Sequence, residues 1–481
     1  MDLTLPDEVH GTAALLQRLE QVEAFGGQVS SAIDQLVQAV VDLQQAAPTP
    51  KPVAPDSAVL DSLHKEVEGL RSKVRELDQQ LQVERAGRDL AQVSRMHPKA
   101  RIVVCVGTLY FGDNAKYAWI ALREQAAALG FQLWWLPYNA DQQALVAGLG
   151  GAVFPASHAQ WSPQHLHTAL SAAVVITSDH FLNPNPFAAA LLAGARQVQL
   201  WHGVSIKEIG LRNLPPGRAL GPHLGRVLAT CGPYARLVGT AAAAQAEWRR
   251  WFAFQRYAPI GYPRNDVLYR EPAAADIAGA DAAALERAAA TVARGRRVVL
   301  YAPTFRDGRP DWLAEVGVDQ LAQACTQRGD LLVVNLHPVE QGRAAQWAQR
   351  WPAVLFTAPR TDVYPLLRLT AALVTDYSSL MFDYLHLDRP VLLYRPDHAA
   401  YVQRSRALFD AKLATPPGPL FTDAAALARA LRRDDLGGDA AHAAARAALR
   451  AQWYDHHDGA SGQRLAALVT EELALAGAEE T

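Results

Sequence analysis

The chain has 481 residues, of which 50% are hydrophobic and 20% charged, and its formal net charge is −2. This length exceeds what one hydrophobic core normally serves, so we expect two large domains and an extension. A nearly neutral chain without a basic domain argues against nucleic acid as a partner. The isolated cysteines, Cys105, Cys231 and Cys325, have neither metal-site nor disulfide spacing, which is typical of a reducing cytoplasm.

The sequence predicts no signal peptide and no membrane-spanning helix. Residues 1–8 are acidic, and no basic segment followed by an apolar one is present, so no signal peptide is predicted. No apolar run approaches the roughly 20 residues that a membrane-spanning helix needs. We therefore expect a cytoplasmic protein whose contact with a membrane, at its inner face, is peripheral.

The first hundred residues differ in pattern from the rest. Residues 1–47 predict a helical segment and residues 48–55 a stiff proline-rich linker. Residues 56–96 predict a coiled coil, because apolar residues alternate at spacings of three and four: Leu60, Leu63, Val67, Leu70, Val74, Leu77 and Leu81. Valine at the central a positions with leucine at d favours a parallel pair of helices, and hence a homodimer. The alternative is that these helices pack on the chain's own domains.

From residue 100 onward, short apolar runs alternate with alanine-rich helical stretches. This pattern is typical of parallel sheets covered on both faces, so the fold class is α/β with two Rossmann-like domains. We place them at residues 100–265 and 266–450, with carboxyl-terminal helices at 451–481. A single helix over residues 273–290 leads into the second sheet. The predicted strands are residues 102–106, 133–136, 173–177, 197–201, 297–301, 331–336, 354–357, 371–375 and 391–394.

Polar residues stand at the ends of several predicted strands. His202 follows one strand directly, with Gly203 allowing a sharp turn and Lys207 nearby. Histidine accepts protons near neutral pH and suits the activation of an alcohol. His337 ends another strand, and the proline that follows it restricts its backbone. Both histidines have the alternative of a purely structural role.

Two further strand ends predict anion binding. Thr304 and Arg306 follow one strand, and a guanidinium can hold two phosphate oxygens; its alternative is a surface pair with Asp307. Ser378 and Ser379 stand on a turn between a strand and a helix, where free backbone N–H groups favour phosphate. Their alternative is a simple helix cap. The turn-rich segment at residues 261–266 is either part of the site or an interdomain hinge.

Taken together, these segments resemble one family. The segments are Trp201-His202-Gly203, Gly261-Tyr262-Pro263-Arg264-Asn265-Asp266, Tyr301-Ala302-Pro303-Thr304-Phe305-Arg306, His337-Pro338, Thr375-Asp376-Tyr377-Ser378-Ser379 with Phe382-Asp383, and Tyr401 with Arg406-Ala407-Leu408-Phe409-Asp410. In this order, over residues 174–422, they resemble the CDP-glycerol glycerophosphotransferases, which are polymerases and primases of teichoic acids and phosphate-containing capsules. The resemblance implies a GT-B-like fold with an amino-terminal acceptor domain and a carboxyl-terminal CDP-donor domain.

The resemblance also implies roles for residues. His202 is the base, and His337 contacts the pyrophosphate or assists the departing CMP. Asp383 approaches ribose or polyol hydroxyls. The phosphate-binding residues are Thr304, Arg306, Asp376, Ser378 and Ser379. The supporting residues are Gly203, Lys207, Arg264, Asp266 and Arg406.

The implied reaction moves a polyol phosphate, most simply glycerol phosphate, from a CDP-linked donor to a hydroxyl of a glycan or lipid-linked polymer and releases CMP. No cofactor or metal ion is required, because positioning and charge neutralisation carry phosphoryl transfer. One alternative is a glycosyltransferase of the same fold that uses a CMP- or UDP-sugar; another is a non-catalytic coiled-coil scaffold. Glycerol or ribitol, primase or polymerase, and the identity of the acceptor stay open.

Overall fold

The structure is a computed structural model that describes residues 57–179, 185, 187–212, 231–306, 311–337, 340, 343–404, 412, 415–436 and 439–478. The chain divides into two compact units, Met1–Asp89 and Leu90–Thr481. The predicted helical segment at 1–47 and the linker at 48–55 lie outside the described residues. The domain boundaries predicted inside the second unit stay predictions.

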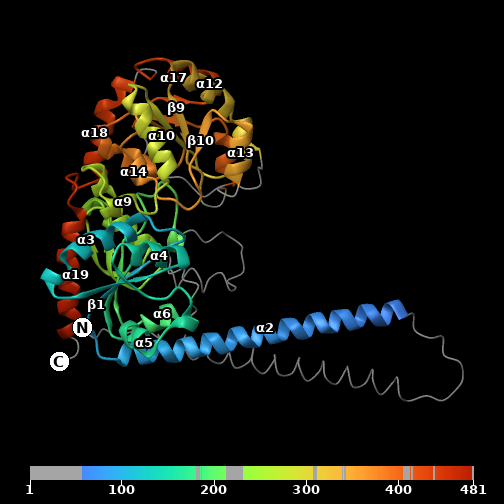
Figure 1. Cartoon of the computed structure of the whole chain (residues 1–481), viewed down its shortest axis with the longest axis vertical. Helices are drawn as coiled ribbons and strands as arrows, with labels where there is room; N and C mark the ends of the chain where they lie inside the picture. The colour runs from blue at the N-terminus through green and yellow to red at the C-terminus, as the bar shows by residue number, and fades with distance from the viewer. Residues whose placement is uncertain are drawn as a thin grey trace, which may run out of the picture. The chain divides into compact units, whose positions relative to one another are not determined.

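Helix α2 (Ser57–Met96) is a single helix of 40 residues that covers the predicted coiled-coil range (Figure 1). Its pairing with a second chain stays a prediction. The last part of α2 belongs to the second unit, where Ser94 is buried and its hydroxyl donates to the Leu191 carbonyl oxygen (2.7 Å).

Among its described residues, the second unit contains two sheets in which every pairing is parallel, which confirms the predicted α/β class. The first sheet has the order β3-β2-β1-β4-β5-β6-β7 and the second β10-β9-β8-β11-β12-β13. Both contain the Rossmann arrangement, in which the strand order reverses beside the first strand. The first sheet is made of β1 (Ala100–Val106), β2 (Gln132–Leu136), β3 (Ala152–Val153), β4 (Ala172–Thr177), β5 (Arg196–Gln199), β6 (Tyr234–Val238) and β7 (Phe254–Ala258). The second is made of β8 (Val298–Ala302), β9 (Leu331–Val334), β10 (Val354–Phe356), β11 (Ala372–Thr375), β12 (Val391–Tyr394) and β13 (Leu420–Phe421).

Helices accompany both sheets, and Figure 1 shows α12, α13 and α17 around β9 and β10. Those of the first part of the unit are α3 (Asp113–Leu129), α4 (Ala140–Gly148), α5 (Pro163–Leu170), α6 (Ala188–Leu191) and α8 (Gln245–Trp251). Those that follow are η4 (Pro263–Leu268), α9 (Ala274–Ile277), α10 (Ala282–Ala293), α11 (Trp312–Glu315), α12 (Val318–Arg328), α13 (Ala344–Arg350), α14 (Tyr364–Leu367), α15 (Leu380–Tyr384), η6 (Leu385–Leu387), α16 (His398–Arg404), α17 (Ala424–Arg432), α18 (Ala443–Trp453) and α19 (Ser461–Ala478). No helix among the described residues is long and apolar enough to cross a bilayer.

One prediction about the helices is wrong. The single helix expected over residues 273–290 is two helices, α9 and α10. Gly279 interrupts them with φ +80°, and a Cβ atom there would lie 2.5 Å from the Phe111 carbonyl oxygen. Because only glycine fits this backbone and this approach, the helix ends before it.

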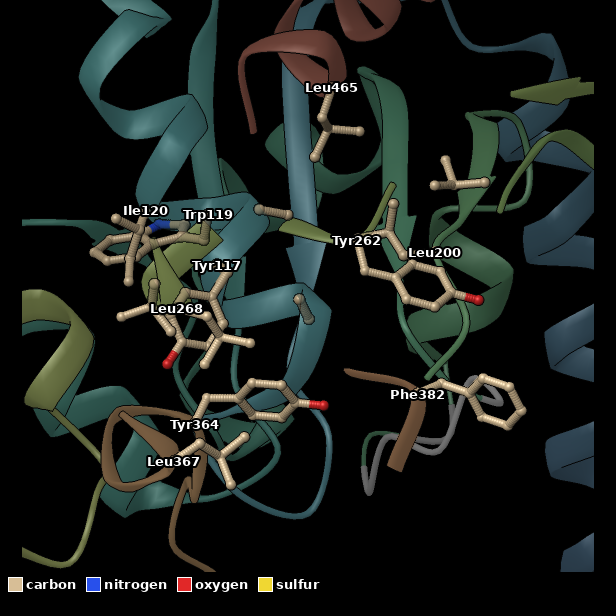
Figure 2. Close-up of a cluster of buried hydrophobic side chains, with 14 of the residues drawn as sticks. Tyr117, Trp119, Ile120, Leu200, Tyr262, Leu268, Tyr364, Leu367, Phe382 and Leu465 are labelled. Atoms are coloured by element: carbon tan, nitrogen blue, oxygen red, sulfur yellow. The ribbon is translucent and has the colours of Figure 1, made fainter. Parts of the chain in front are cut away.

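One hydrophobic cluster contains residues of both sheets and of the elements that connect them. Figure 2 shows Ile120 of α3, Tyr262 and Leu268 from the connecting segment, Phe382 of α15 and Leu465 of α19 in this cluster. The final helix α19 lies beside α3 and packs against β4 of the first sheet (Figure 1). The end of the chain therefore returns to the first half, and the shared core holds the two sheets together.

Candidate functional site

Most of the predicted site residues lie at the carboxyl edges of the two sheets. His202 follows β5, Thr304 and Arg306 follow β8, His337 follows β9, and Asp376 begins the turn after β11. The strand order reverses between β1 and β4 and between β8 and β11. Ligands of open α/β sheets bind outside the carboxyl ends of strands at such reversals, so this edge is the candidate site.

The loop that carries His202 has an unusual backbone. Trp201 has φ +56°, in the left-handed region that non-glycine residues rarely occupy, and Gly203 has φ +142°. The Trp201 N–H donates to Gln199 Oε1 (2.8 Å), and its carbonyl oxygen accepts from Asn114 Nδ2 (2.8 Å). These bonds hold a strained conformation of the kind that concentrates at functional sites.

The His202 ring is partly exposed and lies on the indole of Trp201, with ring centroids 4.2 Å apart and planes inclined by 24°. Its Nδ1 is 3.3 Å from the Ser178 carbonyl oxygen and 3.7 Å from Asp179 Oδ1. The sequence reasoning missed Asp179. The sequence did contain a signal, because Asp179 follows a predicted strand, residues 173–177, just as His202 follows another. In the structure these two strands, β4 and β5, pair.

The His202 loop of the first sheet touches the serine turn of the second. A Cβ atom on Gly203 would lie 2.7 Å from Ser379 Oγ and 3.2 Å from Arg264 Nη2. No side chain fits in this space without displacing its neighbours, so glycine allows the two loops to meet. The loop that carries the histidine predicted to act as base thus meets the turn that carries a serine predicted to bind phosphate.

A buried ion pair joins the same elements. Arg264 Nη2 lies 2.6 Å from Asp383 Oδ2 and also donates to the His202 carbonyl oxygen (2.9 Å). Its Nη1 donates to Asp113 Oδ1 at the start of α3 (2.6 Å). One guanidinium therefore connects the His202 loop with helices of both halves, which gives Arg264 a positioning role.

Asp383 has a different place from the one predicted. Its side chain is fully buried, whereas we expected it to approach a ribose or polyol hydroxyl. Its carboxylate accepts hydrogen bonds from Arg264 Nη2 (2.6 Å), Asn265 Nδ2 (3.0 Å), Tyr364 Oη (2.7 Å) and Tyr454 Oη (3.0 Å). These four bonds use its acceptor capacity, so in this structure Asp383 orients protein groups and does not face a ligand.

Burial and charge explain the protonation states of Arg264 and of the two tyrosines that bond to Asp383. Burial alone would lower the pKa of Arg264, but the charge of Asp383, followed by Tyr364 and Asp113, raises that pKa well above its usual range. Burial raises the pKa of the Tyr364 and Tyr454 hydroxyls well above 10. The arginine therefore stays charged and both tyrosines stay protonated donors.

Thr304 and Arg306 are also placed differently from the prediction that they hold phosphate. Arg306 is buried and pairs with Asp376 Oδ2 and Asp397 Oδ2, both at 2.8 Å, while its Nη1 donates to the Thr304 carbonyl oxygen (2.7 Å). The Thr304 hydroxyl donates to Asp376 Oδ2 (2.9 Å). Burial would lower the pKa of Arg306, but Asp376 and Asp397 raise it. Because the donors and acceptors of these groups bond to one another, they fix the turn after β11. Asp307, the alternative partner predicted for Arg306, lies outside the described residues.

The two serines of the turn remain available for a ligand. Ser378 Oγ accepts from the Leu380 N–H at 3.3 Å, whereas Ser379 makes no capping hydrogen bond, and both are partly exposed. Arg395 donates to the Asp376 carbonyl oxygen (3.2 Å) and lies over the Tyr377 ring (4.7 Å). This partly exposed guanidinium was missed by the sequence reasoning, because nothing in the sequence shows that the loop after β12 reaches this turn.

His337 lies exposed after β9, and its ring stacks on Phe305 with centroids 5.3 Å apart. Phe305 follows β8, the neighbouring strand, so the two loops meet at the carboxyl edge. The stacked pair presents a flat, partly apolar surface at this edge. Pro338, predicted to restrict His337, lies outside the described residues.

The remaining supporting residues have mixed outcomes. Lys207 Nζ lies 5.4 Å from the centre of the Tyr401 ring, which stacks on Tyr377 of the serine turn. Asp266 accepts from the backbone N–H groups of Ser461 (3.0 Å) and Gly462 (2.7 Å), so it holds the start of α19 and supports the fold. Arg406 lies outside the described residues.

No group of three or more His, Cys, Asp and Glu side chains in the described part of the chain is arranged to hold a metal ion. A surface hollow of about 320 Å³ is lined by residues of the amino end of β1 and of β2. It lies at the edge of the sheet opposite to His202. The volume of a hollow therefore does not locate the candidate site. The candidate site is located by the polar loops that converge at the carboxyl edges of the sheets.

Comparison with known proteins agrees with this fold and these motifs. The chain is 26% identical over 235 residues to a teichoic acid poly(glycerol phosphate) polymerase of Bacillus spizizenii, covering 46% of this chain and 57% of the relative. It is 25% identical over 285 residues to a teichoic acid ribitol-phosphate primase of the same organism, covering 57% and 69%. The chain spans 26% to 57% of the length of the poly(glycerol phosphate) polymerases that it matches.

A solved structure of the wall teichoic acid polymerase TagF superposes with a TM-score of 0.62 at 20% identity, covering 85% of this chain and 98% of that one. This similarity supports the fold. The family model of CDP-glycerol:poly(glycerophosphate) glycerophosphotransferases matches residues 111–471, which include every strand of both sheets except β1 and every candidate site residue named above. The chain therefore belongs to the CDP-glycerol:poly(glycerophosphate) glycerophosphotransferase family.

Proposed function

We propose that this protein transfers a polyol phosphate from a CDP-linked polyol to an acceptor hydroxyl during synthesis of a cell-surface phosphopolymer, and releases CMP. The observation that carries the proposal is the contact between the His202 loop and the serine turn at Ser379. In this proposal His202 is the base and the serine turn binds the phosphates, and the contact joins their loops from two separate sheets. Such a pairing is what a reaction between an acceptor alcohol and a diphosphate donor requires.

The reaction is a displacement at phosphorus. His202 Nε2 takes the proton of the acceptor hydroxyl as the acceptor oxygen attacks the phosphorus that bears the polyol. The bond from that phosphorus to the bridging oxygen breaks, and CMP leaves with the electron pair. General-base assistance of this kind contributes about 10²- to 10⁴-fold to a rate.

Ser378 and Ser379 donate to oxygens of the donor pyrophosphate in this proposal. Arg395 supplies the positive charge first assigned to Arg306, because Arg306 is committed to two carboxylates. His337 contacts the pyrophosphate or the departing CMP. Charge neutralisation at the transferring phosphoryl group is the main catalytic demand of this chemistry.

The donor and acceptor are proposed by class. Names of relatives include both glycerol phosphate and ribitol phosphate, so the polyol is one of these and glycerol is the simplest choice. The acceptor is a hydroxyl of a glycan or of a lipid-linked polymer. A lipid-linked acceptor places the enzyme in the cytoplasm, at the inner face of the cell membrane, as a peripheral protein.

We also propose that α2 pairs with the α2 of a second copy. Leu70 is 51% exposed on this helix although it occupies a d position of the heptads, and Val67 and Val74 at a positions are only partly covered. Burying such a seam against an identical one is the ordinary reason for a heptad repeat.

The catalytic proposal is tested with His202→Gln. We expect this variant to lower CMP release from CDP-glycerol, with a polymer acceptor, by about 10²- to 10⁴-fold. His158→Gln is the matched control, because His158 is exposed and distant in sequence from every site residue. A His202→Gln enzyme as active as the wild type would remove His202 from the mechanism.

A further inference from the structure

Asp179 lies beside His202 because of the register of two neighbouring strands. β4 and β5 are parallel, and Thr177 pairs with Gln199. Asp179 stands two residues beyond Thr177, and His202 three residues beyond Gln199. Both loops therefore leave the sheet at the same edge and the same height.

Two hydrogen-bond acceptors lie near His202 Nδ1. They are the Ser178 carbonyl oxygen at 3.3 Å and the Asp179 carboxylate, whose Oδ1 is at 3.7 Å. A carbonyl oxygen cannot donate, and an ionised carboxylate cannot either. In the neutral ring the proton is therefore on Nδ1, and Nε2 carries the lone pair that a base needs.

The rest of the His202 environment fixes the ring, and a second carboxylate that acts on it is already paired with an arginine. Trp201 stacks on the ring face. Asp113, which also acts electrostatically on His202, is committed to Arg264 at 2.6 Å. Among the described residues, Asp179 is therefore the carboxylate that forms an ion-pair contact with the imidazole.

We propose that Asp179 is a positioning residue for catalysis, holding His202 in the tautomer with the proton on Nδ1 and stabilising the imidazolium that forms during transfer. This inference rests on the proposed function. When the acceptor proton moves to Nε2, the ring becomes a cation with its Nδ1 proton in place. Asp179 keeps its charge and takes no proton, so the charge develops between two partners already in position.

The test combines kinetics with a spectroscopic readout. In Asp179→Asn we expect kcat for CMP release to fall by about tenfold to a hundredfold, less than in buried triads because this pair is partly exposed. We expect the KM for the CDP-linked donor to change less than twofold, since Asp179 does not touch the phosphates in this account. Asp179→Glu should recover part of kcat.

The tautomer is read from the nitrogen chemical shifts of protein labelled with ¹⁵N-histidine, with the His202 signals assigned by comparison with His202→Gln. We expect the Nδ1–H form in the wild type and a shift toward the Nε2–H form in Asp179→Asn. Asp141→Asn, an exposed carboxylate on α4, is the control and should change neither readout.

Two results would overturn the inference. One is a wild-type ring in the Nε2–H form. The other is an Asp179→Asn protein whose tautomer equals that of the wild type, even if kcat falls, because the residue would then be merely structural. The tautomer is measured without substrate, so it remains informative if the chain releases no CMP; that failure would count against the proposed function alone.

Discussion

At the residue scale, Arg264 links the chemistry to the fold. Its guanidinium is nearly fully buried and binds Asp113, Asp383 and the His202 carbonyl oxygen at once. A fork of five donors suits such a site, and a lysine ammonium would not reproduce it. The position of the His202 backbone therefore depends on a buried residue.

Replacing Arg264 should affect both stability and activity. Arg264→Ala leaves the fully buried Asp383 and the partly buried Asp113 without a partner. Removing one member of a buried pair costs roughly 3–5 kcal/mol. Urea unfolding and CMP release measure the two effects. Arg256→Ala, at an exposed position of β7, is the control, and we expect it to stay within about 0.5 kcal/mol of the wild type. An Arg264→Ala protein as stable as the control would contradict the role of this ion pair.

Individual residues also show where the sequence was sufficient and where it was not. His202, Ser378 and Ser379 could be predicted as candidates because strand ends, glycine and hydroxyls are local signals, and the structure has all three at the carboxyl edges of the sheets. The partners of Arg306 and Asp383 were missed, because Asp397 and Tyr454 lie 91 and 71 residues away in the chain. Distance in sequence hid the fact that these charges satisfy one another.

At the scale of elements, the strands of continuous apolar residues were predicted to within two residues. The strands missed were β3, β6, β7 and β13. β3 and β13 have two residues each, and β7 is an edge strand with polar residues at its centre. β6 contains Arg236, which is buried because it pairs with Glu471 and Glu472 of α19. A charge neutralised by a distant helix does not look like part of a strand.

The element that follows α15 predicts a dependence of stability on pH. His386 lies in η6, its Nδ1 is 2.6 Å from Tyr269 Oη, and burial lowers its pKa from 6.5 to about 4. Between these two values the unfolded chain binds one more proton than the folded one. The contribution of His386 to the free energy of unfolding is therefore constant above pH 6.5 and decreases as the pH falls toward 4.

This effect is measured by urea unfolding at pH 7 and pH 5. We expect the wild type to lose about 1–2 kcal/mol more between these values than His386→Gln, which cannot titrate. His158→Gln again serves as the control, since an exposed histidine should not change the slope. Equal losses in the wild type and in His386→Gln would show that His386 titrates alike in both states.

At the scale of the whole molecule, the pattern of alternating elements predicted two parallel sheets but not how they meet. Their contact depends on buried pairs such as Lys116 with Asp362 (2.7 Å), which join α3 to the segment before α14. Such pairs form between residues 246 positions apart, and a single sequence contains no sign of them. The candidate site at the carboxyl edges depends on this contact.

Pairing of α2 predicts the mass of the protein in solution. We expect twice the chain mass of 52.2 kDa by light scattering, and a monomer for Leu70→Lys with Val74→Lys, because two charges then occupy the seam. Glu68→Gln with Glu76→Gln changes the net charge equally on the outer face of the helix and should stay dimeric. A monomeric wild type, or a dimer that survives the lysines, would refute the pairing.

The central claim is that the two sheets bring an acceptor base to a CDP-linked polyol. Its most direct test offers the purified chain CDP-glycerol, CDP-ribitol, a CMP-sugar and a UDP-sugar, each with a polymer acceptor, and follows nucleotide release and the mass of the product. We expect CMP release and addition of a polyol phosphate with one of the two CDP-polyols. Sugar transfer from a nucleotide sugar, with no CMP released from either CDP-polyol, would contradict the account.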